Sequence, residues 1–473
     1  MADRRPGRTG AAALALAALL SACSMAPEYH APETAAPAQF KEVAGWTAAQ
    51  PRDEEGRGLW WSVYDDPVLA DLEDRAAKAS PTLAAALARY DAARATARVD
   101  ASALFPQIGV NGQASRDRVS ANRPLSTGSA REYDNYVSGG SIDYELDLWG
   151  RIRNQVKAAG AEAAASVADL ASAQLSLQAA VADAYFRLRG LDAQARVLDE
   201  SVKAFTRAYD LTAKRHAGGV ASGIDVNRAG TVLGNARAQE ATIANQRAAT
   251  EHEIAALVGE VASAFGVPVA QVMPAPPAPP SATPSELLQR RPDIAAAERR
   301  VFAANARIGV AKAAFFPSLS LGATGGWQTT NGSLLTTPNT FWSLGPLSAL
   351  LNVFDGGRRS AQVRISRAEY DETAADYRQT VLTAFRQVED ALAAMHHLSD
   401  ASVAQKDAAD AAQRTSDIAM SRYRDGASDY LDVVTAQTDA LAAERAYITV
   451  QTQRMQASVA FVKALGGGPA AAQ

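Results

Sequence analysis

The chain repeats itself once along its length, and this repeat constrains the fold more than any other feature of the sequence. Pro81 matches Pro292 at a shift of 211 residues, and Gly150 matches Gly357 at a shift of 207. The change in shift falls between two alternating, strand-like segments, where a surface loop tolerates insertions, while the helical segments keep their register. We therefore expect an internal tandem repeat whose two halves build one structure together, an organisation that is unusual for an enzyme domain.

The N-terminus has the pattern of a secretory signal. Three arginines within residues 1–8 precede an apolar run at 11–20 that is too short to span a bilayer, followed by Leu20-Ser21-Ala22-Cys23. The small residues before the single cysteine favour a lipoprotein signal peptide at 1–22, with Cys23 as the lipid-bearing first mature residue. The alternative is an ordinary signal peptide with an incidental cysteine. A single cysteine excludes an intrachain disulfide and a cysteine metal cluster.

The charge balance gives no reason to expect nucleic acid as a partner. Removing residues 1–22 takes three Arg and one Asp from totals of 47 basic and 51 acidic residues, so the formal charge changes from −4 to −6. Nucleic-acid-binding surfaces are basic, and this chain is mildly acidic. Length alone would predict about three domains, but the repeat favours one structure built from both halves.

Long proline-free helices dominate both halves. The stretch from Gly150 to His216 would span roughly 100 Å as one helix, far more than a globular helix, so it needs lateral support. In the second half, apolar residues at spacings of four and three form a heptad seam: Tyr377, Val381, Ala384, Val388, Ala391, Met395 and Leu398. A second apolar seam lies beside the first, displaced by one residue around the helix, at Leu382, Phe385 and Leu392. Two seams favour a tube of helices; a plain antiparallel coiled-coil hairpin is the alternative.

Four segments alternate between apolar and polar residues, as membrane β-strands do. We expect these strands at about 105–116, 135–148, 316–328 and 341–354, with a bulge or kink at Gly345-Pro346. In the first segment, for example, one face carries Ile108, Val110, Gly112 and Ala114. One lipid-facing and one wet face is the pattern of a barrel wall, and the alternative is a half-buried strand of a soluble sandwich. Four strands cannot close a barrel, so the chain has to oligomerise.

No motif for covalent chemistry is present. The chain contains no HExxH, no Gly-x-Ser-x-Gly and no P-loop. Neighbouring helical residues such as His396 and His397 point about 100 degrees apart, which favours ordinary surface histidines over a metal pair. We therefore expect no enzymatic activity and no cofactor, apart from the covalent lipid on Cys23.

Both halves contain a glycine turn between two long helices. The first turn contains Gly219, Ser222 and Asp225, and the second contains Gly426, Ser428, Asp429 and Asp432. Glycine permits the left-handed residue that such a turn needs. Ser222 with Asp225, and Asp429 with Asp432, also fit helix capping, in which these side chains satisfy free backbone amides. Capping alone could explain the acids, and a functional role remains open on the residues alone.

The chain resembles the outer membrane factors, the TolC-like channels, and specifically their lipoprotein branch. The resemblance covers nearly the whole mature chain and rests on several motifs in the right order: Cys23 before Pro27-Glu28-Tyr29, Trp60-Trp61 with Asp66-Pro67, Arg291-Pro292-Asp293-Ile294, Ala313 to Pro317, and Phe354 to Arg358. It implies a homotrimer, in which three chains of four strands close a twelve-stranded barrel in the outer membrane. An α-helical coiled-coil tunnel would continue the barrel across the periplasm, with a belt that the Pro-rich stretch 274–284 crosses.

The resemblance also implies roles for residues of the two turns. Asp432 and Asp429 match constriction positions of the family, and Tyr423 matches a tyrosine that holds the closed periplasmic mouth, so a gate of Asp429, Asp432, Tyr423 and Asp225 is expected. Three-fold symmetry would gather the acids into a ring that favours cations. Ser428 stands where the type member of the family has a gate arginine, so the closing network must differ here, and Arg422 or Arg424 could supply replacement pairs. Adaptor docking is expected at Gly219, Ser222, Gly426 and Ser428.

The function that follows is a passive exit duct for small toxic compounds, opened by a periplasmic adaptor protein and an inner-membrane pump. The alternative is a periplasmic coiled-coil adaptor or structural lipoprotein without a pore. The expected organisation is a signal peptide at 1–22, an anchor and belt segment at 23–66, a first repeat at 67–261, a Pro-rich crossover at 262–284, a second repeat at 285–466 and a tail at 467–473.

Overall fold

The computed structural model describes residues 24–32, 58–122, 124, 128–270 and 291–467. The predicted lipid-bearing Cys23 lies outside these residues. The chain divides into two units, which are described one by one. The first consists of Met1–Glu33, Arg89–Ser166 and Ala296–Arg378, and the second of Thr34–Ala88, Val167–Ala295 and Gln379–Gln473.

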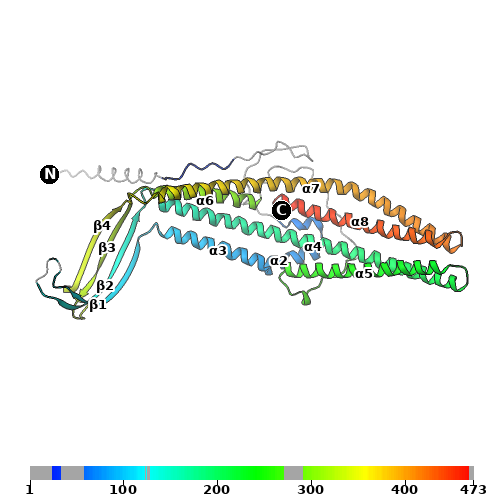
Figure 1. The fold of residues 1–473 in the computed structure, drawn as a ribbon, viewed down its shortest axis with the longest axis horizontal. Helices are drawn as coiled ribbons and strands as arrows, with labels where there is room; N and C mark the ends of the chain where they lie inside the picture. The colour runs from blue at the N-terminus through cyan, green and yellow to red at the C-terminus, as the bar shows by residue number, and fades with distance from the viewer. Residues whose placement is uncertain (1–23, 33–57, 123, 125–127, 271–290, 468–473) are drawn as a thin grey trace, which may run out of the picture. The chain divides into compact units, whose positions relative to one another are not determined.

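Each half of the chain forms the same series of elements, a helix, two strands and two helices (Figure 1). The first series is α3 (Pro81–Ser102), β1 (Gln107–Val119), β2 (Arg131–Leu146), α4 (Arg151–Ala217) and α5 (Gly223–Leu257). The second is α6 (Pro292–Ala313), β3 (Ser318–Thr329), β4 (Thr340–Leu350), α7 (Arg358–Arg424) and α8 (Tyr430–Ala464). The predicted tandem repeat is confirmed, since α4 and α7 both have 67 residues and α5 and α8 both have 35.

The remaining elements are short. They are η1 (Trp60–Tyr64), α2 (Pro67–Ala79), η2 (Ala262–Ala264) and η4 (Thr337–Asn339). Within the described residues, no helix combines the length and the apolar character that crossing a membrane requires.

The four strands lie in the first unit and form one antiparallel sheet in the order β1-β2-β3-β4 (Figure 1). Residues that pair directly across an antiparallel sheet share a face. The register aligns one apolar row across all four strands, formed by Ile108, Ile142, Ala323 and Leu344. The next row across β2, β3 and β4 is Tyr144, Leu321 and Leu347. The predicted alternation is therefore a property of the whole sheet.

The predicted irregularity at Gly345-Pro346 is confirmed. Leu321 pairs with Leu347 and Ala323 with Leu344, so two residues of β4 stand opposite Gly322 alone. A bulge of this kind keeps the apolar residues of β4 on one face on both sides of the extra residue.

Strand β4 ends at Leu350, earlier than the predicted 354. The chain beyond it turns into α7, and the carboxylate of Asp355 accepts hydrogen bonds from the backbone of Gly357 (3.0 Å) and Arg359 (3.2 Å). The same carboxylate pairs with the guanidinium of Arg359 at 2.7 Å. The strand therefore ends shortly before Asp355, whose carboxylate organises the start of the helix.

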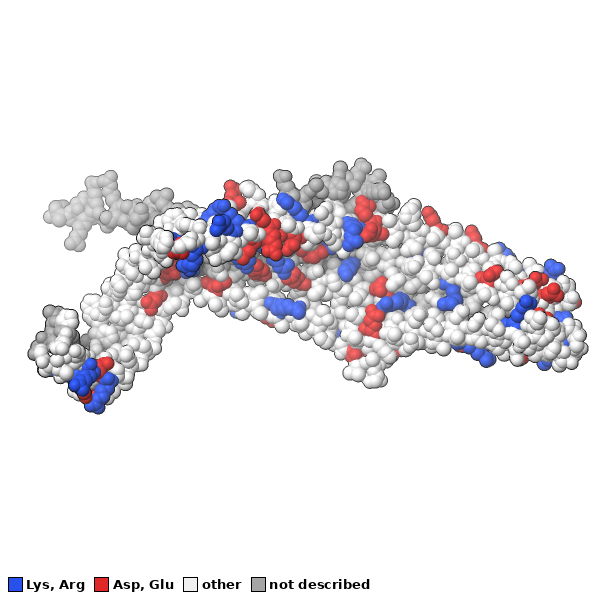
Figure 2. All heavy atoms as spheres, viewed as in Figure 1, with Lys and Arg blue, Asp and Glu red and all other residues white. Residues whose placement is uncertain are grey.

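Charge is sparse over the strands on the face that Figure 2 shows, and basic side chains gather at one end of the β1–β2 hairpin. There Arg116 and Arg118 approach Glu132 at 3.7 and 3.4 Å, and all three side chains are well exposed. An apolar band bounded by charge is typical of a wall that faces lipid over part of its height.

The second unit has an aromatic core that explains two sequence motifs. Trp60, Trp61 and Tyr64 of η1 pack in one buried cluster with residues of α2 and α4. Asp66 caps α2 by accepting from the amides of Val68 (2.9 Å) and Leu69 (3.1 Å), and it also accepts a hydrogen bond from the Tyr185 hydroxyl of α4. The Trp60-Trp61 and Asp66-Pro67 motifs thus hold α2 against the long helix.

Arg291 joins three helices within the second unit. Its side chain is 6 % exposed and donates to the carbonyl of Ala464 at 2.9 Å, to the carboxylate of Asp293 at 2.6 Å and to Gln387 at 2.9 Å. The start of α6, the middle of α7 and the end of α8 are therefore tied by one buried guanidinium, whose planar fork suits several acceptors at once.

The two predicted seams of α7 differ in burial. Val381, Ala384, Val388 and Ala391 of the first seam are buried within the chain. In the second seam Leu392 is 9 % exposed, whereas Leu382 is 60 % exposed. Most of the first seam is therefore covered by the described residues of this chain, and part of the second is left without such cover.

Candidate functional site

The two helix tips of the second unit, α4–α5 and α7–α8, end in the same glycine turn. Gly219 and Gly426 have φ angles of 74 and 75 degrees, in the left-handed region that side chains disfavour. In each turn the amide after the glycine donates, at 2.8 Å, to the carbonyl five residues earlier: Val220 to Arg215, and Ala427 to Arg422. This pattern closes an α-helix at its C-terminus, and it explains why both glycines recur at the repeat distance.

The tips differ in how the next helix is capped. At α5, the Ser222 hydroxyl accepts from the amide of Asp225, and the Asp225 carboxylate accepts from the amide of Ser222, both at 3.2 Å. At α8, the side chain of the N-cap residue Asp429 makes no capping hydrogen bond. Asp429 and Asp432 are both exposed. Capping therefore accounts for Ser222 and Asp225, but it does not account for Asp429.

Tyr423 connects the two tips within one chain. Its side chain is 5 % exposed, its hydroxyl lies 3.1 Å from the Thr212 hydroxyl, and its backbone carbonyl accepts from the Arg215 guanidinium at 2.7 Å. The same guanidinium lies 4.6 Å from the centre of the Tyr423 ring, and the ring of Tyr430 packs edge-on at 5.4 Å. Burial raises the pKa of Tyr430 to about 12, so the Tyr430 ring that packs against Tyr423 is uncharged near neutral pH.

Two grooves flank the tips. One, of about 450 Å³, runs between α7 and α8 and is lined by Asp432, Asp439 and Arg422 among others. Ser428 also lines it, and its buried hydroxyl has no hydrogen-bond partner in the part of the chain that the structure describes. The other, of about 410 Å³, runs between α5 and α8 and is mostly apolar, with Ile224, Val232 and Leu431 in its wall.

The arginine that contacts Tyr423 at the tips is not one of the two that the sequence suggested, Arg422 and Arg424. Arg422 and Arg424 form no ion pair with any described acid, and the Arg422 guanidinium only reaches the carbonyl of Ala427 at 3.5 Å. The cation that contacts Tyr423 is Arg215, which lies 208 residues earlier in the chain. No local pattern could identify it, because the contact depends on how the two repeats are packed.

One group of potential metal-ligating side chains comes together among the described residues, namely His396, His397 and Asp400 on α7. These residues are exposed and lie on the same helix more than twenty residues before its end. They take no part in the contacts of the tips.

A family model described as outer membrane efflux protein matches residues 72–260 and 283–467 of the chain. The chain belongs to the outer membrane efflux protein family. The two matched segments coincide with the two structural repeats.

This efflux protein is similar over almost its whole length to two curated proteins. It is 33 % identical to the antibiotic efflux pump outer membrane protein ArpC of Pseudomonas putida, over 95 % of this chain and 93 % of ArpC. It is also 33 % identical to the outer membrane protein OprJ of Pseudomonas aeruginosa, over 97 % of this chain and 96 % of OprJ.

The fold of this efflux protein is that of a solved outer-membrane channel. The structure of OprN matches with a TM-score of 0.87 at 32 % identity, covering 94 % of this chain and 99 % of OprN. The protein is an outer membrane channel of a tripartite efflux pump, with a large periplasmic helical portion. It is a transport protein and not an enzyme, and the alternative of an adaptor or structural lipoprotein without a pore is excluded.

Proposed function

We propose that three copies of the chain form one exit duct that is closed at the α4–α5 and α7–α8 tips and opens when a periplasmic adaptor docks there. An inner-membrane pump would supply the energy. The observation that carries this proposal is the pair of exposed carboxylates at Asp429 and Asp432, because the first makes no capping bond and both stand at the helix tip. Three-fold symmetry would bring six such acids around one axis, where they narrow the pore and favour cations.

Two further features support a trimer. The sheet has two edge strands, β1 and β4, whose outer edges pair with no other strand among the described residues. In lipid such edges are costly unless a neighbouring chain pairs with them. Leu382 also leaves an apolar position on α7 for a neighbouring helix. A closed twelve-stranded barrel and a continuous helical tube satisfy both.

The path of residues 24–32 supports a lipid anchor at Cys23. In the first unit, the Ser24 hydroxyl donates to the side-chain oxygen of Asn154 of α4 at 3.0 Å, and the side-chain amide of Asn305 donates to the carbonyl of Pro27 at 2.9 Å. The Tyr29 hydroxyl donates to Glu298 at 2.6 Å. Asn154 follows the end of β2 by only eight residues, so a lipid on Cys23 would enter the membrane beside the strands.

The grooves at the tips are the proposed docking surfaces for the adaptor, together with the turn residues Gly219, Ser222, Gly426 and Ser428, of which Ser428 lines the groove between α7 and α8. A coiled-coil hairpin of an adaptor would bury apolar side chains in the groove of Ile224 and Leu431. The proposed cargo is a class of small toxic compounds, in keeping with the antibiotic efflux named for ArpC.

We expect the change Arg215→Ala to loosen the tips and raise the single-channel conductance of the purified protein. The change removes the hydrogen bond to the Tyr423 carbonyl and the contact with its ring, together worth about 1–3 kcal/mol. Arg207→Ala is the matched control, because Arg207 is an exposed arginine on the same helix, two turns before Arg215. Equal conductance of Arg215→Ala and the control would contradict a closure that depends on this contact.

A further inference from the structure

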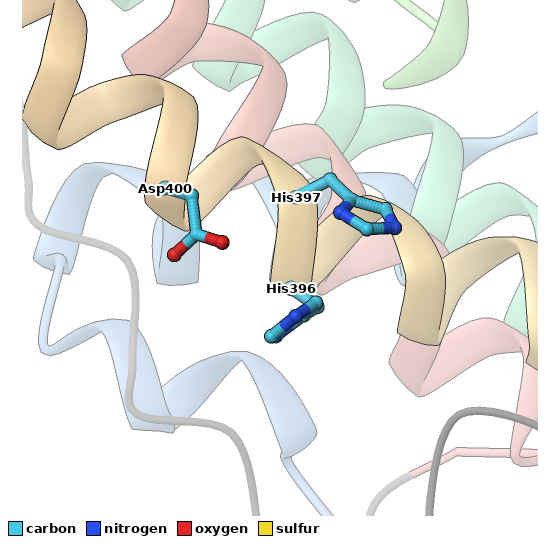
Figure 3. Close-up of side chains that lie close together, drawn as sticks. All are labelled: His396, His397 and Asp400. Carbon is cyan, nitrogen blue, oxygen red and sulfur yellow. The ribbon is translucent and has the colours of Figure 1, made fainter.

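Three exposed side chains with metal-ligating atoms converge on the middle of α7, away from the tips. His396, His397 and Asp400 each offer one ligand atom, and these atoms all lie within 4.8 Å of one another. The two imidazole rings have their centres 5.0 Å apart. Figure 3 shows all three side chains projecting from one stretch of the helix.

Helix geometry explains why the third residue changes the interpretation of the histidine pair. At about 100 degrees per residue, His396 and His397 point in different directions, and the pair alone therefore favours ordinary surface histidines. Asp400 lies one turn further on, about 40 degrees from His396 and 60 degrees from His397 around the axis. Viewed down the helix axis, its direction therefore lies between those of the two histidines, and it is within helical-neighbour distance of both.

The local charge favours a cation. Between Arg386 and Lys406 the helix carries no Lys or Arg, whereas it carries Glu389, Asp390 and Asp400. The carboxylate of Asp390 lies 3.9 Å from the guanidinium of Arg386, so Asp400 is the acid of this stretch that matters for a bound cation. The guanidinium of Arg454, on α8, is engaged with Ser402 and Gln451 at 3.2 and 3.0 Å. No described basic side chain forms an ion pair with Asp400, so its carboxylate is available to an ion.

We propose that His396, His397 and Asp400 bind one divalent transition-metal ion of the zinc class per chain. Two imidazole nitrogens and one carboxylate oxygen are a donor set that suits Zn²⁺ or Cu²⁺ and does not suit Ca²⁺ or Mg²⁺. Around a tetrahedral zinc with bonds of about 2.0–2.1 Å, the ligand atoms stand about 3.3 Å apart. The widest pair has to close by about 1.5 Å, which exposed side chains can do by adjusting their torsions. Water completes the coordination.

The test is a titration of the purified, chelator-treated full chain with ZnCl₂ by isothermal calorimetry. We expect one saturable site per chain. The double substitution His396→Gln with His397→Gln should abolish this site, and Asp400→Asn should weaken it at least tenfold. All three side chains are exposed, so the variants should retain the melting temperature and the channel activity of the parent chain.

His252→Gln is the matched control, because His252 is an exposed helical histidine with no second histidine beside it. Its affinity for Zn²⁺ should stay within twofold of the parent value. A site that survives the double histidine substitution, or the lack of any saturable site, would overturn the proposal. Equal binding of Mg²⁺ would also overturn it, because such binding would need only an acidic surface. Since the readout is metal binding, either outcome leaves the proposed gating untouched.

Discussion

Replacing Glu73 with Gln should stabilise the protein at neutral pH by about 3 kcal/mol. Glu73 lies on α2 between core residues Leu72 and Ala76 and is 1 % exposed, and neither of its carboxylate oxygens has a hydrogen-bond partner among the described residues. Burial raises the pKa of this carboxyl to about 9 from an ordinary value of 4.5. The folded chain keeps the proton up to that pH, whereas the unfolded chain releases it above about pH 4.5.

The sign of the effect follows from this difference in bound protons. Because the folded state binds the extra proton, stability falls as pH rises from about 4.5 towards 9, at about 1.4 kcal/mol per pH unit. Glu73→Gln keeps the shape and removes the titration, so its advantage should vanish at pH 4 and grow up to pH 8. The measurement is the midpoint of thermal unfolding at pH 4, 6 and 8.

Asp74→Asn provides the control for Glu73→Gln. Asp74 is the next residue on α2, it is exposed, and its ion pair with Lys78 at 3.2 Å is a surface pair of little energetic weight. The Asp74→Asn variant should therefore show the same pH dependence of thermal stability as the parent chain. A gain for Glu73→Gln that is the same at pH 4 and pH 8 would show that Glu73 does not hold a proton in the folded chain.

Leu321→Arg should abolish assembly in the outer membrane. Leu321 of β3 shares a face with Tyr144 and Leu347, in the apolar row that we assign to lipid. A basic residue at the lipid face near the middle of the bilayer costs ~2–4 kcal/mol, and a trimer incurs this cost three times. The measurement is the amount of protein that fractionates with the outer membrane as a species resistant to mild detergent.

Ser320→Arg is the matched change on the other face of the same strand. Ser320 is exposed, and its hydroxyl shares one hydrogen bond with the hydroxyl of Ser348, at 2.6 Å. A wet face accepts an arginine, so this variant should assemble. If the two variants are affected equally, or if Ser320→Arg is the worse one, the assignment of the two faces is wrong.

The fold was predictable because its signals are local and repeated. The proline-free stretch from Gly150 to His216 predicts a helix that the structure places at Arg151–Ala217. The alternating segments predict strands, and Gly345-Pro346 predicts the bulge in β4. The end of β4 was harder to predict from the sequence. The alternation continues past Leu350, whereas Asp355 already accepts hydrogen bonds from the backbone at the start of α7.

The candidate site was predictable only where it is built from neighbours in sequence. Ser222 and Asp225 are three residues apart, and the capping interaction that this spacing allows is present. The same spacing at Asp429 and Asp432 does not produce a cap. The contact of Arg215 with Tyr423 joins residues from different repeats, and the buried, unpaired hydroxyl of Ser428 depends on the packing around it. Such features become visible only when the packed helices are known.

The most direct test of a channel closed at its helix tips is the single-channel conductance of the mature chain in planar bilayers, measured with and without the double change Asp429→Ala and Asp432→Ala. We expect the parent chain to give a small, cation-preferring conductance, because a ring of carboxylates narrows and polarises the pore. The double variant should conduct more and lose the preference for cations. A channel whose conductance and ion preference are unaffected by the double change would contradict the proposed gate.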